Sequence, residues 1–257
     1  MRIIKKISIP ESVKSIGDYA FSNCSSLENI SLPSAITSIN VGVFRGCSSL
    51  SQIKIPESVE SIGKYAFSQC SSLSNITIPS SIYYINKETF LGCSSLKQIS
   101  IPESVKYICK YAFSNCSSLE SVSLPSVIFS IKEGAFCECS SLSQITIPSC
   151  IVEIEKRVFY KCKSLTQISL PQNLNVINEG AFSECSLLTN ITIPPNVTSI
   201  RDSAFSGCTS LINITIPTSV KNIGNSVFYG CTSLKNVVIG SSISSIKDYT
   251  FYECSSL

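Results

Sequence analysis

The sequence contains no histidine and no tryptophan, and only one methionine among its 257 residues. Histidine is the side chain most often used as a general base, and it is the commonest metal ligand. No two cysteines have the C-x-x-C spacing of a zinc site, and no glycine-rich loop could cradle a phosphate. We therefore expect no catalytic residue, no cofactor and no metal, and we predict that the protein is not an enzyme.

Charge is also scarce, since charged residues make up 14% of the chain and 20 basic residues face 17 acidic ones. The net charge of +3 is small and scattered, which excludes the dense basic stripe that nucleic acid requires. Proline and serine break every apolar run after a few residues, so we expect no membrane insertion by this chain. The opening segment, MRIIKKISIP, lacks the long apolar core of a signal peptide.

What the sequence has in abundance is repetition with a period of 23 residues. Phenylalanine recurs at this period from Phe21 to Phe251, and leucine recurs from Leu27 to Leu257. A period held over eleven cycles indicates one short structural unit stacked on itself. Cysteine keeps the same period, at positions 24, 47, 70, 93, 116, 139, 162, 185, 208, 231 and 254.

One unit, residues 51–73, shows how each coil should fold. Alternation of isoleucine with polar residues at its start predicts a strand with one buried face. Pro56 then ends that strand, because proline cannot donate a ladder hydrogen bond. A second extended segment follows, and then one helical or 3₁₀ turn. Eight side chains should point inward: Ile53, Ile55, Val59, Ile62, Ala66, Phe67, Cys70 and Leu73.

The predicted fold is therefore a repeat solenoid, mainly β with short 3₁₀ or helical turns, in which eleven coils stack their strands in parallel. We expect a single domain over residues 5–257, with residues 1–4 as a lead-in. The last coil stops at Leu257 without the polar cap that solenoids need, so we expect a fragment of a longer protein.

Eleven of the fourteen cysteines fall at one repeat position. Equivalent residues on adjacent coils should lie about 4.8 Å apart, the spacing between strands. At that separation parallel side chains keep their Cβ atoms wider than the ~3.8 Å typical of a disulfide. We predict a column of reduced, buried thiols that pack as small apolar groups.

The consensus unit x-I-x-I-P-x-S-V-x-x-I-G-x-x-A-F-x-x-C-x-S-L-x resembles the BspA-like class of leucine-rich repeats over essentially the whole chain. The commoner pattern L-x-x-L-x-L-x-x-N is matched only in its first half, since Ala35 stands where asparagine should. The resemblance therefore does not imply the horseshoe geometry of that wider group. It does imply a surface-exposed adhesin. Proteins of this class are associated with coaggregation and with host matrix proteins such as fibronectin and fibrinogen.

The outward side chains of the first strand form two polar columns. One column is mostly Asn and Gln, as at Gln52, Asn75 and Gln98, and the next is mostly Ser and Thr, as at Thr77 and Ser100. Such a surface is either a hydrogen-bonding platform for protein or glycan, or a set of in-register ladders that stabilise the stack. The sequence alone leaves both interpretations open.

The outward positions of the second segment are less uniform. Apolar residues gather there in units four to eight, and a large exposed apolar patch usually marks a contact surface. Three further cysteines, Cys109, Cys137 and Cys150, fall in units five to seven. The alternative is drift among tolerant surface positions. The candidate protein-binding residues are Tyr83, Tyr84, Tyr107, Phe129, Val152 and Val176.

Together these features predict a non-catalytic protein-binding module. The resemblance to BspA-like adhesins places it at the cell surface or outside the cell, in contact with host matrix proteins or neighbouring cells. A self-associating structural array and an intracellular scaffold are the alternatives, because uncapped coils expose strand edges and reduced thiols suit the cytosol.

Overall fold

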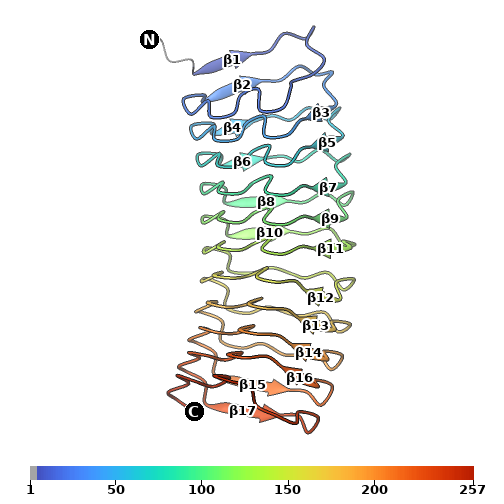
Figure 1. Ribbon diagram of the computed structural model, residues 1–257. Helices are drawn as coiled ribbons and strands as arrows, with labels where there is room; N and C mark the ends of the chain where they lie inside the picture. Colours follow the sequence, from blue (N-terminus) through green and yellow to red (C-terminus); the bar gives the residue numbers. More distant parts are fainter. Residues whose placement is uncertain (1–4) are drawn as a thin grey trace.

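The protein is an elongated stack of 23-residue coils, with the two ends of the chain at opposite ends of the stack (Figure 1). The computed structural model describes residues 5–257, so the predicted lead-in over residues 1–4 lies outside the described residues. Each coil has two short extended segments and a turn segment. The predicted parallel β-solenoid is confirmed. Within residues 5–257, no helix is long and apolar enough to cross a membrane.

The first extended segments form one column of strands, seen on the left of Figure 1. Equivalent residues pair in parallel, such as Ile7 with Ile30 and Ile214 with Val237. In the coils between β10 and β15 the column continues as single bridges, for example between Thr146 and Ser169. The strands are β1 (Lys6–Ser8), β2 (Asn29–Ser31), β4 (Gln52–Ile53), β6 (Asn75–Ile76), β8 (Gln98–Ser100), β10 (Ser121–Ser123), β15 (Asn213–Ile216) and β17 (Asn236–Ile239).

The second extended segments form another column on the right of Figure 1. Their strands are only two residues long because a turn follows at once, and all pairs are again parallel with a shift of 23 residues. They are β3 (Ser38–Ile39), β5 (Ser61–Ile62), β7 (Tyr84–Ile85), β9 (Tyr107–Ile108), β11 (Ser130–Ile131), β12 (Glu153–Ile154), β13 (Val176–Ile177), β14 (Ser199–Ile200) and β16 (Asn222–Ile223).

The turn segment closes with hydrogen bonds between residues three apart, as from the Ala66 N–H to the Gly63 carbonyl at 3.3 Å. These are single turns of the 3₁₀ kind, and none extends into a helix in the described coils. The reason is that Tyr65 and Gln69 have φ angles of 62° and 61°, in the left-handed region. The Tyr65 N–H points to the next coil instead, where it donates to the Lys87 carbonyl at 3.1 Å.

The core is the interior of the coils, and all eight predicted inward residues of residues 51–73 are buried. The phenylalanine column runs through it. Neighbouring rings stack in parallel, for example Phe113 on Phe136 at 5.5 Å between ring centroids and 4° between planes. Phe21 and Phe251, in the first and last coils, are only partly buried because each has a neighbouring coil on one side.

The cysteine column is buried from Cys47 to Cys231, whereas in the end coils Cys24 is exposed and Cys254 is half-buried, so the predicted burial fails where a coil lacks a neighbour. The thiols also make a hydrogen bond. The Cys70 thiol donates to the Phe44 carbonyl at 3.1 Å, and the same bond recurs from Cys47 to Cys254 at 3.1 to 3.2 Å. Burial disfavours the thiolate and raises the pKa of Cys116 to about 12. The thiols therefore satisfy carbonyls that lie inside the stack, beyond the packing role that the sequence predicted.

Candidate functional site

The second-strand column presents exposed aromatic rings on its outward side. Tyr84 and Tyr107 are paired in register between β7 and β9. Their rings stack with centroids 5.1 Å apart and planes 15° apart. This agrees with the spacing of about 4.8 Å expected for equivalent side chains on neighbouring coils.

Two further rings join this pair. Tyr83 contacts Tyr84 edge to face at 4.8 Å and lies 5.9 Å from Tyr107, while Phe129 meets Tyr107 edge to face at 5.7 Å. Tyr83, Tyr84 and Phe129 keep 43%, 46% and 55% of their surface exposed. We call these four residues the aromatic cluster. Burying them would remove considerable apolar surface from water, so they are an energetically favourable contact area.

The two valines predicted for the same surface are placed differently. Val152 is 53% exposed, one coil beyond Phe129, but Val176 is half-buried and pairs with Glu153. The sequence reasoning missed Val127, which is 44% exposed on the same coil as Phe129. Its signal was available, because Val127 occupies a repeat position that holds serine in several other units.

A lysine lies within the cluster's own column, yet its charge is directed away from the rings. Lys106 sits on the coil between Tyr83 and Phe129. Its ammonium group donates to the carbonyls of Glu103 at 2.7 Å and Val127 at 3.1 Å, at the corner of the coil. The centre of the aromatic cluster is therefore uncharged.

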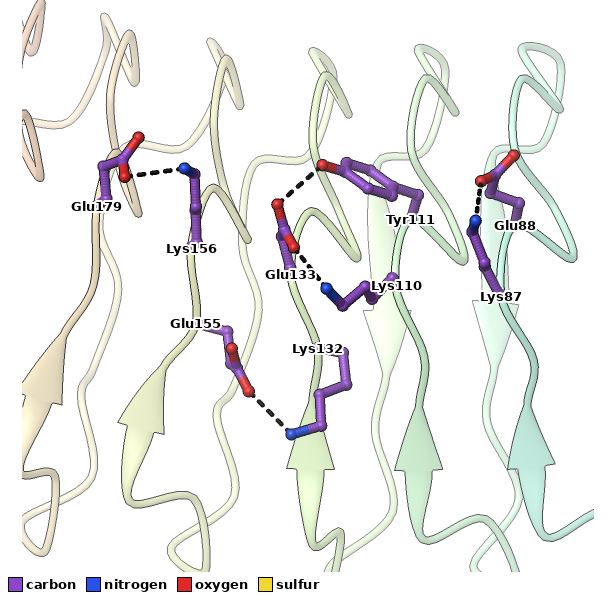
Figure 2. A network of polar contacts seen from close by, with 9 residues as sticks. All are labelled: Lys87, Glu88, Lys110, Tyr111, Lys132, Glu133, Glu155, Lys156 and Glu179. Carbon is purple, nitrogen blue, oxygen red and sulfur yellow. Dashed lines mark hydrogen bonds and ion pairs between the residues drawn. The ribbon is translucent and has the colours of Figure 1, made fainter.

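Beyond the strand ends, ion pairs connect successive coils (Figure 2). Lys110 pairs with Glu133 at 2.8 Å, and the Tyr111 hydroxyl donates to the same carboxylate at 3.1 Å. The Lys110 ammonium group lowers the pKa of Glu133 below its usual value. Similar pairs join Lys132 to Glu155 at 2.9 Å and Lys156 to Glu179 at 2.8 Å.

These ion pairs neutralise one another along the border of the aromatic cluster. Little net charge is therefore left beside these strand ends.

The three cysteines outside the column do not form a second cluster. Cys150 occupies a position held by serine in other coils and makes the same bond as those serines. Its thiol donates to the Ile128 carbonyl at 3.0 Å, as the Ser104 hydroxyl donates to Ile82 at 2.7 Å. Cys137 is buried and Cys109 is half-buried, and burial raises the pKa of both thiols. Their presence in the middle coils therefore adds no argument for a contact surface.

A metal site has no geometric basis in the part of the chain described. Across residues 5–257, no group of three His, Cys, Asp or Glu side chains is placed to hold an ion. The buried thiols are also held in their protonated form, and only thiolates bind metals well.

Comparisons with known proteins agree with this repeat architecture. The family model described as "BspA type Leucine rich repeat region (6 copies)" matches residues 2–116, 84–208 and 175–257. The solved structure of a leucine-rich repeat protein from Bacteroides ovatus is 32% identical, with a TM-score of 0.76 over 99% of this chain and 77% of that one. A comparison with curated proteins found no match.

Two further structures are similar. A leucine-rich cell surface protein from Faecalibacterium prausnitzii is 26% identical, with a TM-score of 0.61 over 99% of this chain and 86% of that one. The pneumococcal vaccine antigen PcpA is 27% identical, with a TM-score of 0.71 over 95% of this chain and 64% of that one.

Proposed function

This chain belongs to the BspA-type leucine-rich repeat family, and from that premise we propose that it is a non-catalytic adhesin module that binds a protein partner through the aromatic cluster. The family supports a protein-binding repeat module. The observation that carries the proposed site is the set of four ring contacts among Tyr83, Tyr84, Tyr107 and Phe129 in the middle coils. Three of these rings are exposed, and the other exposed rings of residues 5–257, Tyr19, Tyr249 and Tyr252, lie in the first and last coils.

The solenoid presents these rings to a partner as a surface that is already formed. Aromatic residues are enriched in protein–protein interfaces, and a few buried rings supply most of the binding energy. The rings here already hold one another in place, so binding orders few side chains and costs little entropy. Val152 is exposed at the position of Phe129 on the next coil, and Val127 is exposed two residues before Phe129, so both would extend the apolar contact. Val176 is half-buried and would contribute less.

We propose that the module acts at the cell surface, where it contacts host matrix proteins or neighbouring cells. Two similar structures support this location, because one is named a cell surface protein and another a vaccine antigen. Fibronectin and fibrinogen are the first partners to test.

The test measures binding of the purified protein to immobilised fibronectin and fibrinogen, with albumin as a control surface. The test variant replaces the cluster residues, Tyr83→Ser, Tyr84→Ser, Tyr107→Ser and Phe129→Ser. A matched control variant, Tyr249→Ser with Tyr252→Ser, removes two aromatic rings that are 63% and 53% exposed in the last coil.

Saturable binding that the test variant loses and the control variant keeps is the expected result. Binding unchanged by the cluster substitutions would reject the cluster as the site. Sedimentation of each protein over a concentration series tests the alternative, in which the protein binds to itself. If oligomers form with rising concentration and only the cluster variant stays monomeric, the partner is a second copy. A folded monomer that binds neither matrix protein would reject both as partners.

A further inference from the structure

A second surface, on the opposite strand column, has a different chemistry. The outward side chains of the first strands line three adjoining hollows, with volumes of about 460, 370 and 750 Å³. The first two share Asn75 and Thr77, and the last two share Ser121 and Ser123. They therefore form one shallow trough along coils two to eight, which we call the amide groove.

The amides that line this groove do not bond to one another. Among residues 5–257, the one hydrogen bond within the Asn/Gln column is from Asn236 to Asn213 at 2.7 Å, beyond the end of the groove. The side chains of Gln52, Asn75, Gln98, Gln144 and Gln167 make none within the described chain. The amide column thus forms a stabilising hydrogen-bonded ladder only between Asn236 and Asn213.

Hydroxyl groups elsewhere in the coil behave differently. The Ser71 hydroxyl donates to the Ser48 carbonyl at 3.3 Å, and Ser104 donates to Ile82 at 2.7 Å. Equivalent bonds recur along the stack at both of those positions. The hydroxyls of Ser100 and its equivalents in the groove have no such partner within residues 5–257. The repeat therefore uses its hydroxyls for stability at some positions and leaves them available in the groove.

Each available group is both a donor and an acceptor, since amides and hydroxyls have both functions. They recur at the spacing between strands, about 4.8 Å, over several coils. Charge is nearly absent, because Lys54 and Glu57 near one end are the charged residues that line the three hollows. A narrow apolar floor comes from side chains such as Ile53 and Ile76, which are 7% and 5% exposed.

From this arrangement we infer that the amide groove binds a neutral, linear oligosaccharide. Such a chain presents hydroxyl groups that donate and accept, repeats along its length, carries no charge, and has apolar C–H faces to rest on the isoleucine floor. Each contact is weak because water competes for it, so affinity comes from many coils engaging one chain.

Other ligand classes fit the groove less well. Protein interfaces favour aromatic residues and arginine, and neither lines the three hollows. Nucleic acid needs basic side chains at each phosphate, and one lysine does not meet that need. The groove also lies on a different strand column from the aromatic cluster, so this inference is independent of the proposed protein-binding site.

The experiment is calorimetric titration with neutral hexasaccharides of glucose, mannose, galactose and N-acetylglucosamine, each beside its disaccharide. The test variant is Gln98→Ala, Gln144→Ala and Gln167→Ala. The control variant is Asn173→Ala, Asn222→Ala and Asn225→Ala, which removes three exposed amides outside the groove. Circular dichroism confirms that both variants remain folded.

We expect at least one hexasaccharide to bind about tenfold or more tightly than its disaccharide, because the longer chain reaches more coils and makes more hydrogen bonds. The test variant should lose about tenfold or more in affinity and the control variant almost none. The inference is overturned if no hexasaccharide binds at millimolar concentration. It is also overturned if the test and control variants bind equally, or if the groove substitutions abolish binding to a matrix protein and leave sugar binding unchanged.

Discussion

The two strand columns of this solenoid share one backbone geometry and one register, yet their outward surfaces differ in kind. On the second-strand side the side chains contact each other, through the aromatic cluster and through ion pairs such as Lys110 with Glu133. On the first-strand side the amides of Gln98 and Gln144 make no contact of that type within the described chain. The repeat restricts the inward residues to those that fit the core. The outward side chains are free either to bond to one another or to remain available to a ligand.

The largest expected effect concerns the core that both surfaces share, through its column of buried thiols. Burial raises the pKa of Cys47, Cys116 and Cys231 to about 12, while an unfolded thiol titrates near pH 8.5. Between about pH 8.5 and 12 the unfolded state loses protons that the folded state keeps. The contribution of these thiols to the free energy of unfolding is therefore fully present below that window. It falls as pH rises, by up to about 1.4 kcal/mol per pH unit for each thiol.

Thermal unfolding followed by circular dichroism at pH 7.5, 9 and 10.5 checks this expectation. The unfolding temperature should fall steeply, and binding at both surfaces should disappear together with the fold. The variant Cys116→Ala should show a shallower pH dependence, because it has one titrating thiol fewer. An unfolding temperature that stays constant to pH 10.5 would contradict the account.

The next effect separates the middle of the core from its end. Phe136 is fully buried, with rings 5.5 Å and 6.0 Å away on either side. We expect Phe136→Ala to lower the free energy of unfolding by about 3–5 kcal/mol. Phe251→Ala should cost clearly less, because Phe251 has one stacked neighbour and is only partly buried. Urea unfolding of both variants measures the difference, and equal costs would contradict a core that is stabilised by stacking on both sides.

A smaller effect should distinguish hydroxyl groups that donate a hydrogen bond to a neighbouring coil from hydroxyl groups that do not. Ser104 and Ser100 lie in the same coil, but only Ser104 donates to a carbonyl of the previous coil. Ser104→Ala should cost about 1 kcal/mol, and Ser100→Ala should stay within about 0.5 kcal/mol of the parent. Urea unfolding distinguishes them. A cost for Ser100→Ala as large as that for Ser104→Ala would show that the groove hydroxyls stabilise the stack.

The smallest effect concerns the ion pairs of the second-strand side. Lys110 lowers the pKa of Glu133, so the pair's contribution is present at neutral pH and is lost as pH falls through that lowered pKa. The pair is partly exposed, so Lys110→Met should lower the free energy of unfolding less than Phe136→Ala or Ser104→Ala does. In a carboxyl-detected NMR titration, Glu133 should titrate at higher pH in this variant. Amide signals of the groove should not move, and their movement would mean that the two surfaces are coupled.

Much of the fold could be predicted from residue spacing because the period is so strict. The parallel register, the phenylalanine stack and the eight inward residues of residues 51–73 follow from equivalent residues lying on adjacent coils. The left-handed residues Tyr65 and Gln69 could not be predicted, since tyrosine and glutamine rarely adopt that conformation. The stack imposes it through hydrogen bonds to the next coil.

For the surfaces, the sequence found the aromatic residues and placed Tyr84 beside Tyr107 on the next coil, but it could not show the contacts between different columns. Tyr107 links Tyr83 and Tyr84 to Phe129 because ring orientation, and not column position, decides the contact. The role of Cys150 was also hidden, since only the folded structure shows its thiol making the hydrogen bond that the Ser104 hydroxyl makes in another coil.

The sequence by itself determined the repeat length, the inward residues and the parallel stack, because burying one apolar face per coil leaves a single consistent arrangement. Only the tertiary structure decided which polar groups are satisfied. A serine or an asparagine looks the same in the sequence whether or not a carbonyl lies within hydrogen-bond distance of it. Differences of a few tenths of an ångström between coils decide whether the bond forms. The amide groove and the cysteine hydrogen bonds therefore emerge only when the coils are stacked.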